Sequence, residues 1–255
     1  MEAIPFYTMI PFILMLAGIA IGPIFFHELW EKNKNLLIFS LVLGTPTAIY
    51  LISSGFSHQL IHQMIFDYLP FIILLGALFV ISGGILVTGF IAAKPKINTL
   101  FLAIGAVLAS FMGTTGAAML LIRPLLVTNA NRKNKIYTIL FFIAIVANCG
   151  GLLTPLGDPP LFLLYLRGVP FTWFFQLLPE WIFINGFLLL IYYFVDSFYY
   201  KREKPEDIAI DTERVMPIRL RGNLNFLWLI GVILPVAFIN EQYIPIIKEN
   251  HYYGF

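Results

Sequence analysis

The sequence predicts an all-α membrane protein with about six spanning helices, one re-entrant helical hairpin and one interrupted helix. Of its 255 residues, 59% are hydrophobic and 12% are charged, whereas charged residues make up roughly a quarter of soluble domains. The mean hydropathy is +0.85. The apolar residues gather in seven runs, and glycine and proline break two of these runs near the middle.

The apolar runs set the order of the elements. They occupy residues 4–26, 36–52, 68–90, 99–128, 137–166, 178–195 and 225–239, against the roughly 20 residues that one span requires. The first run is predicted to be a retained span. Glu2 stands where a signal peptide has Lys or Arg, and the run exceeds the roughly 7–15 residues of a signal core. The aromatic segment 171–181 predicts an interfacial element.

Residues 97–130 are predicted to form the re-entrant hairpin. The sequence G-T-T-G, residues 113–116, divides the apolar run 99–128 into arms of about 14 and 12 residues. At 1.5 Å per residue each arm measures roughly 20 Å, which is short of the roughly 30 Å hydrocarbon core. Two full spans would leave the chain on the same side, and only the short arms disfavour them.

Residues 137–166 are predicted to form a helix that is interrupted at N-C-G-G-L-L-T-P-L-G-D-P-P, residues 148–160. Glycine and proline remove helix propensity and, for proline, the backbone donor. An unpaired backbone group in hydrocarbon costs several kcal/mol, so this segment is expected to line a hydrated cavity enclosed by protein. Interrupted spans of this kind mark binding sites in transporters.

The basic residues predict the sidedness of the chain. With the hairpin, one face collects Lys32, Lys34, Lys94, Lys96, Arg132, Lys133, Lys135, Lys201, Arg202, Lys204, Arg214, Arg219 and Arg221, and the other keeps only Arg167 and Lys248. A single span at 99–128 would split these charges almost evenly. The positive-inside rule therefore favours basic loops in the cytoplasm and an outside N-terminus.

Residues 198–224 are predicted to be a solvated cytoplasmic linker without an apolar period. Its acids are Glu203, Glu206, Asp207, Asp211 and Glu213, interleaved with basic residues. A loop that joins two membrane segments is a simpler interpretation than a regulatory contact. The net charge of +2 and the lone Cys149 predict neither nucleic-acid binding nor a disulfide.

Two interruptions supply the candidate site. The hairpin tip offers hydroxyls and free amides at the start of a half-helix, whose positive end suits a carboxylate, while the carbonyls that end the first arm suit Na⁺. Packing between small residues is the alternative for the tip. Asp158 is an acid at membrane depth, expected to alternate between protonated and cation-bound states. Its other expected role is to cap the short helix 161–166 through its carboxylate, and the two roles are compatible. Arg123 either pairs with Asp158 or an anionic substrate, or extends to the lipid headgroups.

The predicted ion- and substrate-binding residues are Gly113, Thr114, Thr115, Gly116, Asn148, Gly150, Gly151, Thr154, Pro155, Gly157, Asp158 and Arg123. Candidate Na⁺ ligands are the hydroxyls of Thr114, Thr115 and Thr154 and the carboxylate of Asp158, with backbone carbonyls of residues 148–153. Apart from Na⁺ or H⁺ as the coupling ion, no cofactor is expected.

Other polar groups have simpler interpretations. Ser82, Gly83 and Gly84 are expected to serve packing, and His27, Glu28 and Glu31 to lie at the interface. His58 and His62 are expected in a loop or at the interface. An intramembrane aspartyl protease would need Gly-x-Gly-Asp and a second membrane aspartate. The chain has P-L-G-D at 155–158, and Asp67 and Asp196 are expected at span ends near water, so no enzyme is predicted.

The pairing of G-T-T-G-A-A-M-L-L-I-R-P-L-L (113–126) with N-C-G-G-L-L-T-P-L-G-D-P-P-L-F-L (148–163) resembles the ion-transporter superfamily. That superfamily includes divalent-anion/sodium symporters, citrate carriers, arsenite permeases and a class of sodium/proton antiporters. The likeness extends to I-S-G-G-I-L (81–86), G-V-P-F (168–171) and L-R-G-N-L-N-F (220–226), and is greatest to the bacterial citrate transporter or sodium:proton antiporter branch. This resemblance implies the inner membrane of a bacterium as the location of the protein.

The resemblance implies a cation site made by the hairpin tip and the broken helix, with the substrate beside it. The superfamily's Ser-Asn-Thr tip falls on Gly113, Thr114 and Thr115, and its G-G-x-x-T-P-x-G-x-P-P loop falls on Gly150, Gly151, Thr154, Pro155, Gly157, Pro159 and Pro160. The tip lacks the asparagine of the dicarboxylate symporters, and Asp158 replaces a small polar residue. Both departures favour Na⁺/H⁺ antiport as the expected function, with Na⁺- or H⁺-coupled citrate or dicarboxylate transport as the alternative.

Full members of the superfamily are about twice as long and repeat the unit in inverted orientation. Residues 1–197 are therefore expected to be the first repeat of such a transporter, 198–224 a linker and 225–255 the truncated start of the second repeat. A partner chain that carries the second repeat, or a homo-oligomer, is expected to be needed in the lipid bilayer, together with a small cation and a carboxylate substrate.

Overall fold

A computed structural model describes residues 5–90, 92–203 and 216–239 of the chain. Six helical segments within these ranges are long and apolar enough to cross a membrane, which confirms the predicted all-α membrane fold. They are Phe6–Phe25, Asn33–Ser53, Ser57–Gly83, Pro95–Met112, Ile136–Leu153 and Phe171–Tyr200. The chain divides into two compact units, Met1–Phe66 and Asp67–Phe255.

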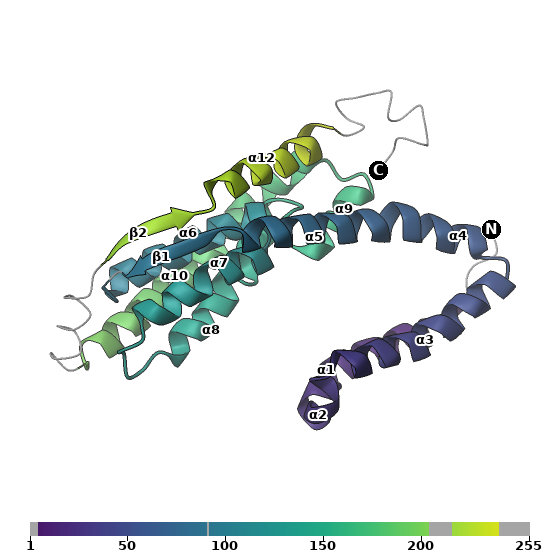
Figure 1. Ribbon diagram of the computed structural model, residues 1–255, viewed down its shortest axis with the longest axis horizontal. Helices are drawn as coiled ribbons and strands as arrows, with labels where there is room; N and C mark the ends of the chain where they lie inside the picture. Colours follow the sequence, from purple (N-terminus) through teal and green to yellow (C-terminus); the bar gives the residue numbers. More distant parts are fainter. Residues whose placement is uncertain (1–4, 91, 204–215, 240–255) are drawn as a thin grey trace. The chain divides into compact units, whose positions relative to one another are not determined.

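The first unit, purple to dark blue in Figure 1, is helical. Its elements are η1 (Phe6–Met9), α1 (Ile10–Phe25), α2 (His27–Trp30), α3 (Asn33–Ser53) and α4 (Ser57–His62). The ring of Trp30 lies 5.3 Å from that of Phe39 and against Gly22, where a Cβ atom would lie 2.5 Å from the indole. Most apolar side chains of α1 and α3 are exposed, as lipid-facing helices require. His58 and His62 lie on α4, so the loop alternative was wrong for them.

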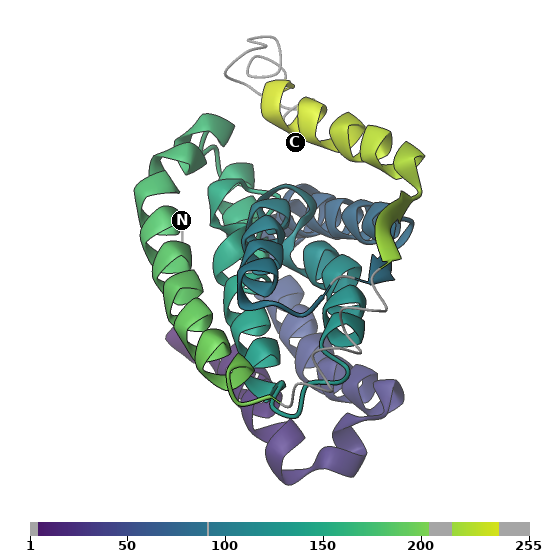
Figure 2. The same ribbon diagram turned by 90° about the vertical axis from the view of Figure 1, so that its left-hand side faces the viewer.

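The second unit contains the hairpin and the broken helix. Its elements are the end of the π-helical η2 (Gln63–Tyr68), then α5 (Leu69–Gly83), β1 (Leu86–Phe90), α6 (Pro95–Met112), α7 (Thr114–Thr128), α8 (Ile136–Ile145), η3 (Cys149–Leu153), α9 (Pro159–Leu166), η4 (Phe171–Leu177), α10 (Leu178–Tyr200), β2 (Met216–Arg221) and α12 (Asn223–Phe238). In Figure 2 the helices of this unit run from blue to yellow.

Helix α6 is the centre of this unit, because it contacts α7, α8, α10 and η3. Its buried face carries Leu102, Ala106 and Ala109, none of which is exposed at all. Two of these three side chains are alanines, so neighbouring backbone can approach closely. The backbone of η3 uses this space, since a Cβ on Gly150 would lie 2.8 Å from the Cα of Ala106.

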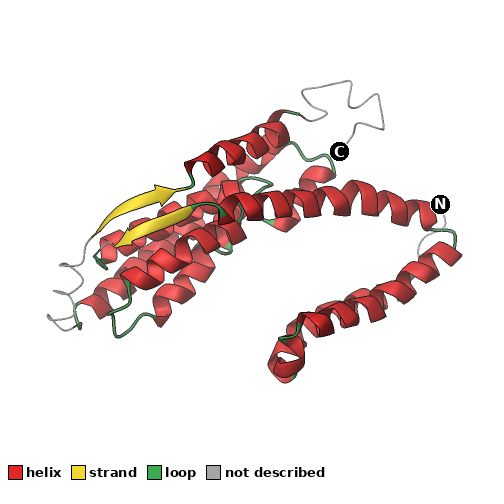
Figure 3. Ribbon diagram, in the orientation of Figure 1, coloured by secondary structure: helices red, strands yellow, loops and turns green. Residues whose placement is uncertain are grey.

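Two short strands depart from the predicted elements. Strands β1 and β2 pair antiparallel, with Leu86 opposite Arg221 and Thr88 opposite Arg219 (Figure 3). Within the apolar run 68–90 the helix ends at Gly83 and β1 follows, and β2 lies within the segment 198–224 that is predicted to be a linker; neither strand was predicted. Gly89 has φ +128° and passes the backbone of Pro217, where no other residue would fit. Residues 204–215 of that linker lie outside the described residues.

Candidate functional site

The hairpin turns at Gly113, whose φ of +81° favours glycine. Its arms have 18 and 15 residues, or roughly 27 and 23 Å, because α6 begins at Pro95, four residues before the apolar run. The predicted helix–turn–helix is present. Its re-entry from one face of the membrane stays a prediction, which the longer first arm makes less compelling.

The predicted interruption of the following span is confirmed. Helix α8 ends at Ile145, a short 3₁₀ turn (η3) covers Cys149–Leu153, Thr154 is extended, and α9 begins at Pro159. Pro159 occupies the first helical position, where the missing N–H is not needed. The segment between α8 and α9, residues 146–158, is called the break below.

The hairpin tip and the break are joined by backbone contacts. The N–H of Thr114 donates to the carbonyl of Gly157 over 2.9 Å. A Cβ on Gly151 would lie 2.7 Å from both the Gly157 carbonyl oxygen and Cγ2 of Thr114. A Cβ on Gly157 would in turn strike the Gly151 carbonyl. The two motifs that the sequence singles out therefore form one structure, and their glycines allow the approach.

Side chains from neighbouring helices satisfy the carbonyls that the break leaves without helical partners. The Gly150 carbonyl accepts hydrogen bonds from Ser110 Oγ at 2.5 Å and Trp181 Nε1 at 2.9 Å. The Cys149 carbonyl accepts one from Asn185 Nδ2 at 3.2 Å. Sequence reasoning placed Trp181 in an interfacial element and did not consider Asn185. A tryptophan and an asparagine four residues apart on an apolar helix were the available signal.

Thr154 lies inside this network. Its hydroxyl donates to the carbonyl of Ser110 and accepts from the N–H of Leu156 at 3.2 Å. The side chain is fully buried. Asn148, another predicted site residue, uses its amide to donate to the carbonyl of Ile143 at 2.9 Å. Pro155 is buried in the same segment.

A cleft of about 420 Å³ opens beside the hairpin tip. Its apolar wall comes from α5, and its other wall from the tip and the break. The lining residues are Ile72, Leu75, Gly76, Leu78, Phe79, Val80, Met112, Gly113, Thr114, Thr115, Gly116, Leu156, Gly157 and Pro159. Of the predicted site residues, the four tip residues and Gly157 line this cleft. Of the others in the break, Gly150, Gly151, Thr154 and Pro155 are buried, Asn148 is exposed and Asp158 is partly buried.

Asp158 stands between the lining residues Gly157 and Pro159 and is partly buried. It is the N-cap residue of α9, and its backbone carbonyl accepts from the N–H of Leu161 at 3.1 Å. Its carboxylate makes no capping hydrogen bond, so the side-chain capping alternative was wrong. Arg123 is exposed on α7, nine residues or roughly 13 Å beyond Thr114. The ion pairs within the described ranges, His27–Glu31 and Arg132–Asp196, involve neither residue.

Ser82 supports the tip from α5. It is 1% exposed, and its Oγ lies against Gly116, where any Cβ would collide with it. This contact agrees with the packing role predicted for residues 82–84. Within the described residues Ser82 Oγ has no hydrogen-bond partner.

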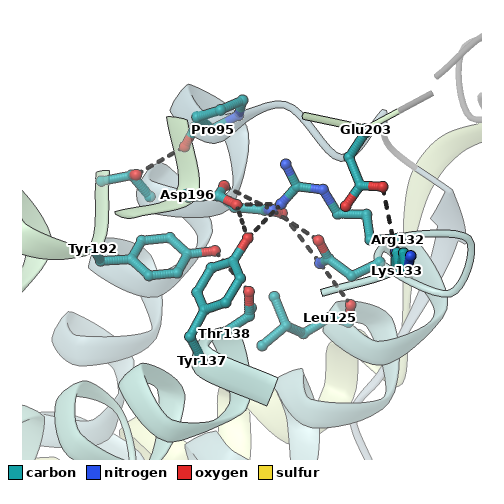
Figure 4. Close-up of polar contacts among 12 residues, drawn as sticks. Pro95, Leu125, Arg132, Lys133, Tyr137, Thr138, Tyr192, Asp196 and Glu203 are labelled. Carbon is teal, nitrogen blue, oxygen red and sulfur yellow. Dashed lines mark hydrogen bonds and ion pairs between the residues drawn. The ribbon is translucent and has the colours of Figure 1, made fainter. Parts of the chain in front are cut away.

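Asp196 departs most from the sequence-based expectation. It was expected near water, but it is fully buried and forms an ion pair with Arg132, which is 4% exposed (Figure 4). Tyr137 and Asn98 also donate to its carboxylate, at 2.6 and 3.2 Å. Burial by itself would lower the pKa of the Arg132 guanidinium, but the negative charge of Asp196 holds that pKa above its ordinary value. The Arg132 guanidinium therefore keeps its charge beside Asp196.

No cluster of three or more His, Cys, Asp or Glu side chains that could hold a metal ion occurs in the described part of the chain. A cation at the tip would instead have hydroxyl, carbonyl and single carboxylate ligands, which are the donors that hard cations prefer. Among the predicted Na⁺ ligands, Thr114 and Thr115 line the cleft.

Comparison with known proteins places the chain in a family. The model of the CitMHS_2 family, described as "Putative citrate transport", matches residues 1–252. No curated protein and no solved structure matches the chain. The matched residues include the hairpin, the break and α12. Together with the six apolar helices, the match indicates a multi-pass membrane protein of a transporter family. Membership of such a family points away from an enzyme. The chain therefore belongs to this citrate-transport family, and the recognition drawn from its two motifs is confirmed.

Proposed function

We propose that the chain is the binding unit of a transporter that moves citrate or a related carboxylate together with Na⁺ or H⁺. The family match is the observation that carries this proposal. The cleft beside the hairpin tip is the proposed substrate site. Its volume of about 420 Å³ falls within the roughly 300–1,000 Å³ of small-molecule pockets.

The start of α7 supports an anionic substrate. The first-turn amides of a helix have no partner within it, and they carry a partial positive charge of roughly half a unit. Thr114 already donates to Gly157, which leaves the amides of Thr115 and Gly116 at the cleft. The exposed Thr115 hydroxyl adds a donor at the same end. A carboxylate group fits this arrangement.

The charge balance supports coupling to a cation. No Lys or Arg is found among the described residues that line the cleft. A multiply charged carboxylate in an apolar cleft needs compensation beyond the partial charge of one helix end. Na⁺ bound with the substrate, or protons carried on it, would supply that charge. The proposed coupling therefore follows from the lining of the cleft.

Na⁺/H⁺ antiport is the second candidate, and Asp158 is the observation that favours it. Its partly buried carboxylate stands between two lining residues and is not used as a helix cap. An acid at membrane depth is costly unless it serves a function. In this candidate function Asp158 exchanges a proton for Na⁺, and no carboxylate substrate is needed.

Calorimetry on the purified chain distinguishes the two candidates. We expect citrate to bind in Na⁺ buffer and to bind at least about tenfold more weakly in choline buffer. Thr115→Val should weaken citrate binding, whereas Thr99→Val, which removes a hydroxyl bonded to Pro95 within α6, should not. Sodium binding that needs no citrate and disappears in Asp158→Asn would instead establish the antiport candidate.

Transport, as distinct from binding, is expected to need a second hairpin and broken helix that enclose the substrate at a repeat interface. We propose that a second unit of this kind, outside these 255 residues, supplies them. Vesicles that contain the chain alone at a monomeric protein density should show no coupled uptake, and addition of a polypeptide with the second repeat should restore it. Uptake by the chain alone at a monomeric protein density would contradict this arrangement.

A further inference from the structure

The buried charges of Arg132 and Asp196 lie outside the cleft and have no part in the function proposed above. Asp196 is eleven residues, or roughly 16 Å, along α10 from Asn185, which contacts the break. Arg132 belongs to the loop between α7 and α8. The pair therefore joins the base of the hairpin, at the end away from its tip, to the end of α10 (Figure 4).

Hydrogen bonds extend this pair across both arms of the hairpin. Asn98 in the first turn of α6 donates to Asp196 at 3.2 Å and to Asn129 at 2.9 Å. Asn129 follows the last turn of α7 and donates back to Asn98 at 3.3 Å. Asn98 and Asn129 are both almost fully buried. The base of the hairpin is thus one connected polar unit, fixed to α10 through Asp196.

The Asp196 carboxylate has three donors, whereas Arg132 has donors without an acceptor. The Asp196 carboxylate receives Tyr137, Asn98 and Arg132 Nη1. Arg132 Nε and Nη2 are buried and have no partner among the described residues. Guanidinium groups usually fill their donors, since each unpaired buried donor is costly.

A second acceptor lies close to Arg132. Glu203 Oε2 accepts from the N–H of Lys133, the next residue after Arg132, at 3.4 Å. Glu203 Oε1 is buried and has no partner in the described part of the chain. Arg132 therefore has unused donors, and the glutamate that is bonded to the next residue has an unused acceptor.

The end of α10 connects the two acceptors. Asp196 and Tyr200 are spaced i, i+4 on one face of α10, and Glu203 follows three residues after the end of the helix. The Arg132 guanidinium carbon lies 5.1 Å from the centre of the Tyr200 ring, and Tyr200 stands between the two acids in the sequence. A guanidinium group that moves over an aromatic face keeps a favourable contact during the movement.

We propose that Arg132 is a two-position latch at the base of the hairpin, bonded to Asp196 in this structure and exchangeable to Glu203 across the Tyr200 ring. After the exchange Asp196 keeps Tyr137 and Asn98 as donors, so neither acid is left without partners. The net charge of the cluster is unchanged. The exchange shifts the loop after α7 along α10 and loosens the hairpin's contacts with the break.

The chain carries its own reporter of this movement. Cys149 is its single cysteine, is partly exposed, and lies in the break beside Gly150, whose carbonyl is bonded to Ser110 of the hairpin. Movement of the hairpin changes the access of a thiol reagent to Cys149. Hydrogen exchange of residues 95–102 and 125–132 reports the base of the hairpin directly.

Three isosteric variants of the full chain in detergent micelles test the latch. Glu203→Gln weakens the second position, so the labelling rate of Cys149 should fall about tenfold. Asp196→Asn weakens the first position, so labelling and exchange at the base should rise about tenfold. Glu180→Gln replaces an exposed acid in the first turn of the same helix and should leave both rates unchanged.

The Glu203 variant decides between a latch and a static clamp. A static clamp predicts wild-type labelling and exchange in Glu203→Gln, and that result would overturn the proposal. If Asp196→Asn does not fold, the double variant Arg132→Met/Asp196→Leu removes both charges, which often preserves stability. In that background the latch predicts that Glu203→Gln has no further effect on Cys149. A slower rate there would show that Glu203 acts without Arg132 and would also refute the latch.

Discussion

Replacing Thr154 by valine separates a structural role of its hydroxyl from a role in cation binding. Sequence reasoning made this hydroxyl a Na⁺ ligand, whereas the structure uses it within the protein. It donates to the Ser110 carbonyl at the end of α6 and accepts from the Leu156 N–H in the break. Valine has nearly the same shape and removes both bonds at once.

The expected loss of stability follows from the two backbone groups that valine leaves without a hydrogen-bond partner. Thr154 is fully buried, so neither the Ser110 carbonyl nor the Leu156 N–H gains water in exchange. A buried polar group that loses its partner costs about 1–3 kcal/mol, so we expect a loss of about 2–4 kcal/mol in the free energy of unfolding. Thr154→Ser retains the hydroxyl and should lose less than about 1.5 kcal/mol.

Reversible unfolding in mixed micelles, followed by tryptophan fluorescence, measures these differences. Thr99→Val is the matched control, because its hydroxyl bonds only to Pro95 four residues earlier in α6, an interaction worth little. A Thr154→Val chain as stable as wild type that no longer binds Na⁺ would refute the reasoning and assign the hydroxyl to a cation. A destabilised chain with normal Na⁺ affinity would support it.

Three further changes test the remaining geometry. In Gly157→Ala the new Cβ would strike the Gly151 carbonyl, so this variant should separate the tip from the break and show no ligand binding in calorimetry. Gly231→Ala on α12, which has open space around it, is the control and should bind normally. Single cysteines at the exposed Lys96 and Asn134, in a Cys149→Ser background, should both label from the cytoplasmic side; labelling from opposite sides would exclude both the re-entrant hairpin and two full spans. Asp158→Asn should have near wild-type stability in the same unfolding assay, since the Asp158 carboxylate makes no capping bond. The variant should lose any pH-dependent Na⁺ binding. Unchanged Na⁺ binding would show that Asp158 lies outside the cation site.

The interruptions could be predicted from the sequence because their causes are local. Gly113 supplies a positive φ at the tip, Gly150 and Gly151 follow the end of α8, and Pro159 begins α9. Their meeting could be predicted only through the family resemblance. The bond from Thr114 to Gly157 joins residues 43 positions apart, and no periodicity in a single sequence encodes such a pair.

The partners of the break could not be predicted for the same reason. Trp181 and Asn185 are on α10, about 30 residues after the carbonyls that they satisfy, and either residue also suits a membrane interface. The prediction that Asp196 lies near water was wrong for a different reason. Its position near a helix end suggested water, but the loop after α7 covers it with Arg132, so depth along a helix did not determine exposure.

Strand β2 had a local signal that the interpretation overlooked. The sequence M-P-I-R-L-R alternates apolar and other residues with period two, as a strand exposed on one face does. The surrounding charges made the whole segment 198–224 look like a linker. Pairing with residues 86–90 then required a partner more than 120 residues away, which alternation alone does not identify.

The satisfied carbonyls of the break bear on how a cation would be held at the tip. The Gly150 carbonyl already accepts two hydrogen bonds, and the Thr154 hydroxyl donates one and accepts one. Several of the oxygens expected around Na⁺ are thereby engaged within the protein, which leaves the hydroxyls of Thr114 and Thr115 and the Asp158 carboxylate as the expected side-chain ligands that make no side-chain hydrogen bond among the described residues. Hard cations take several oxygen ligands, so three are too few for tight binding. A carboxylate substrate in the cleft would supply the missing oxygens, and each ligand would then raise the affinity for the other by the same factor.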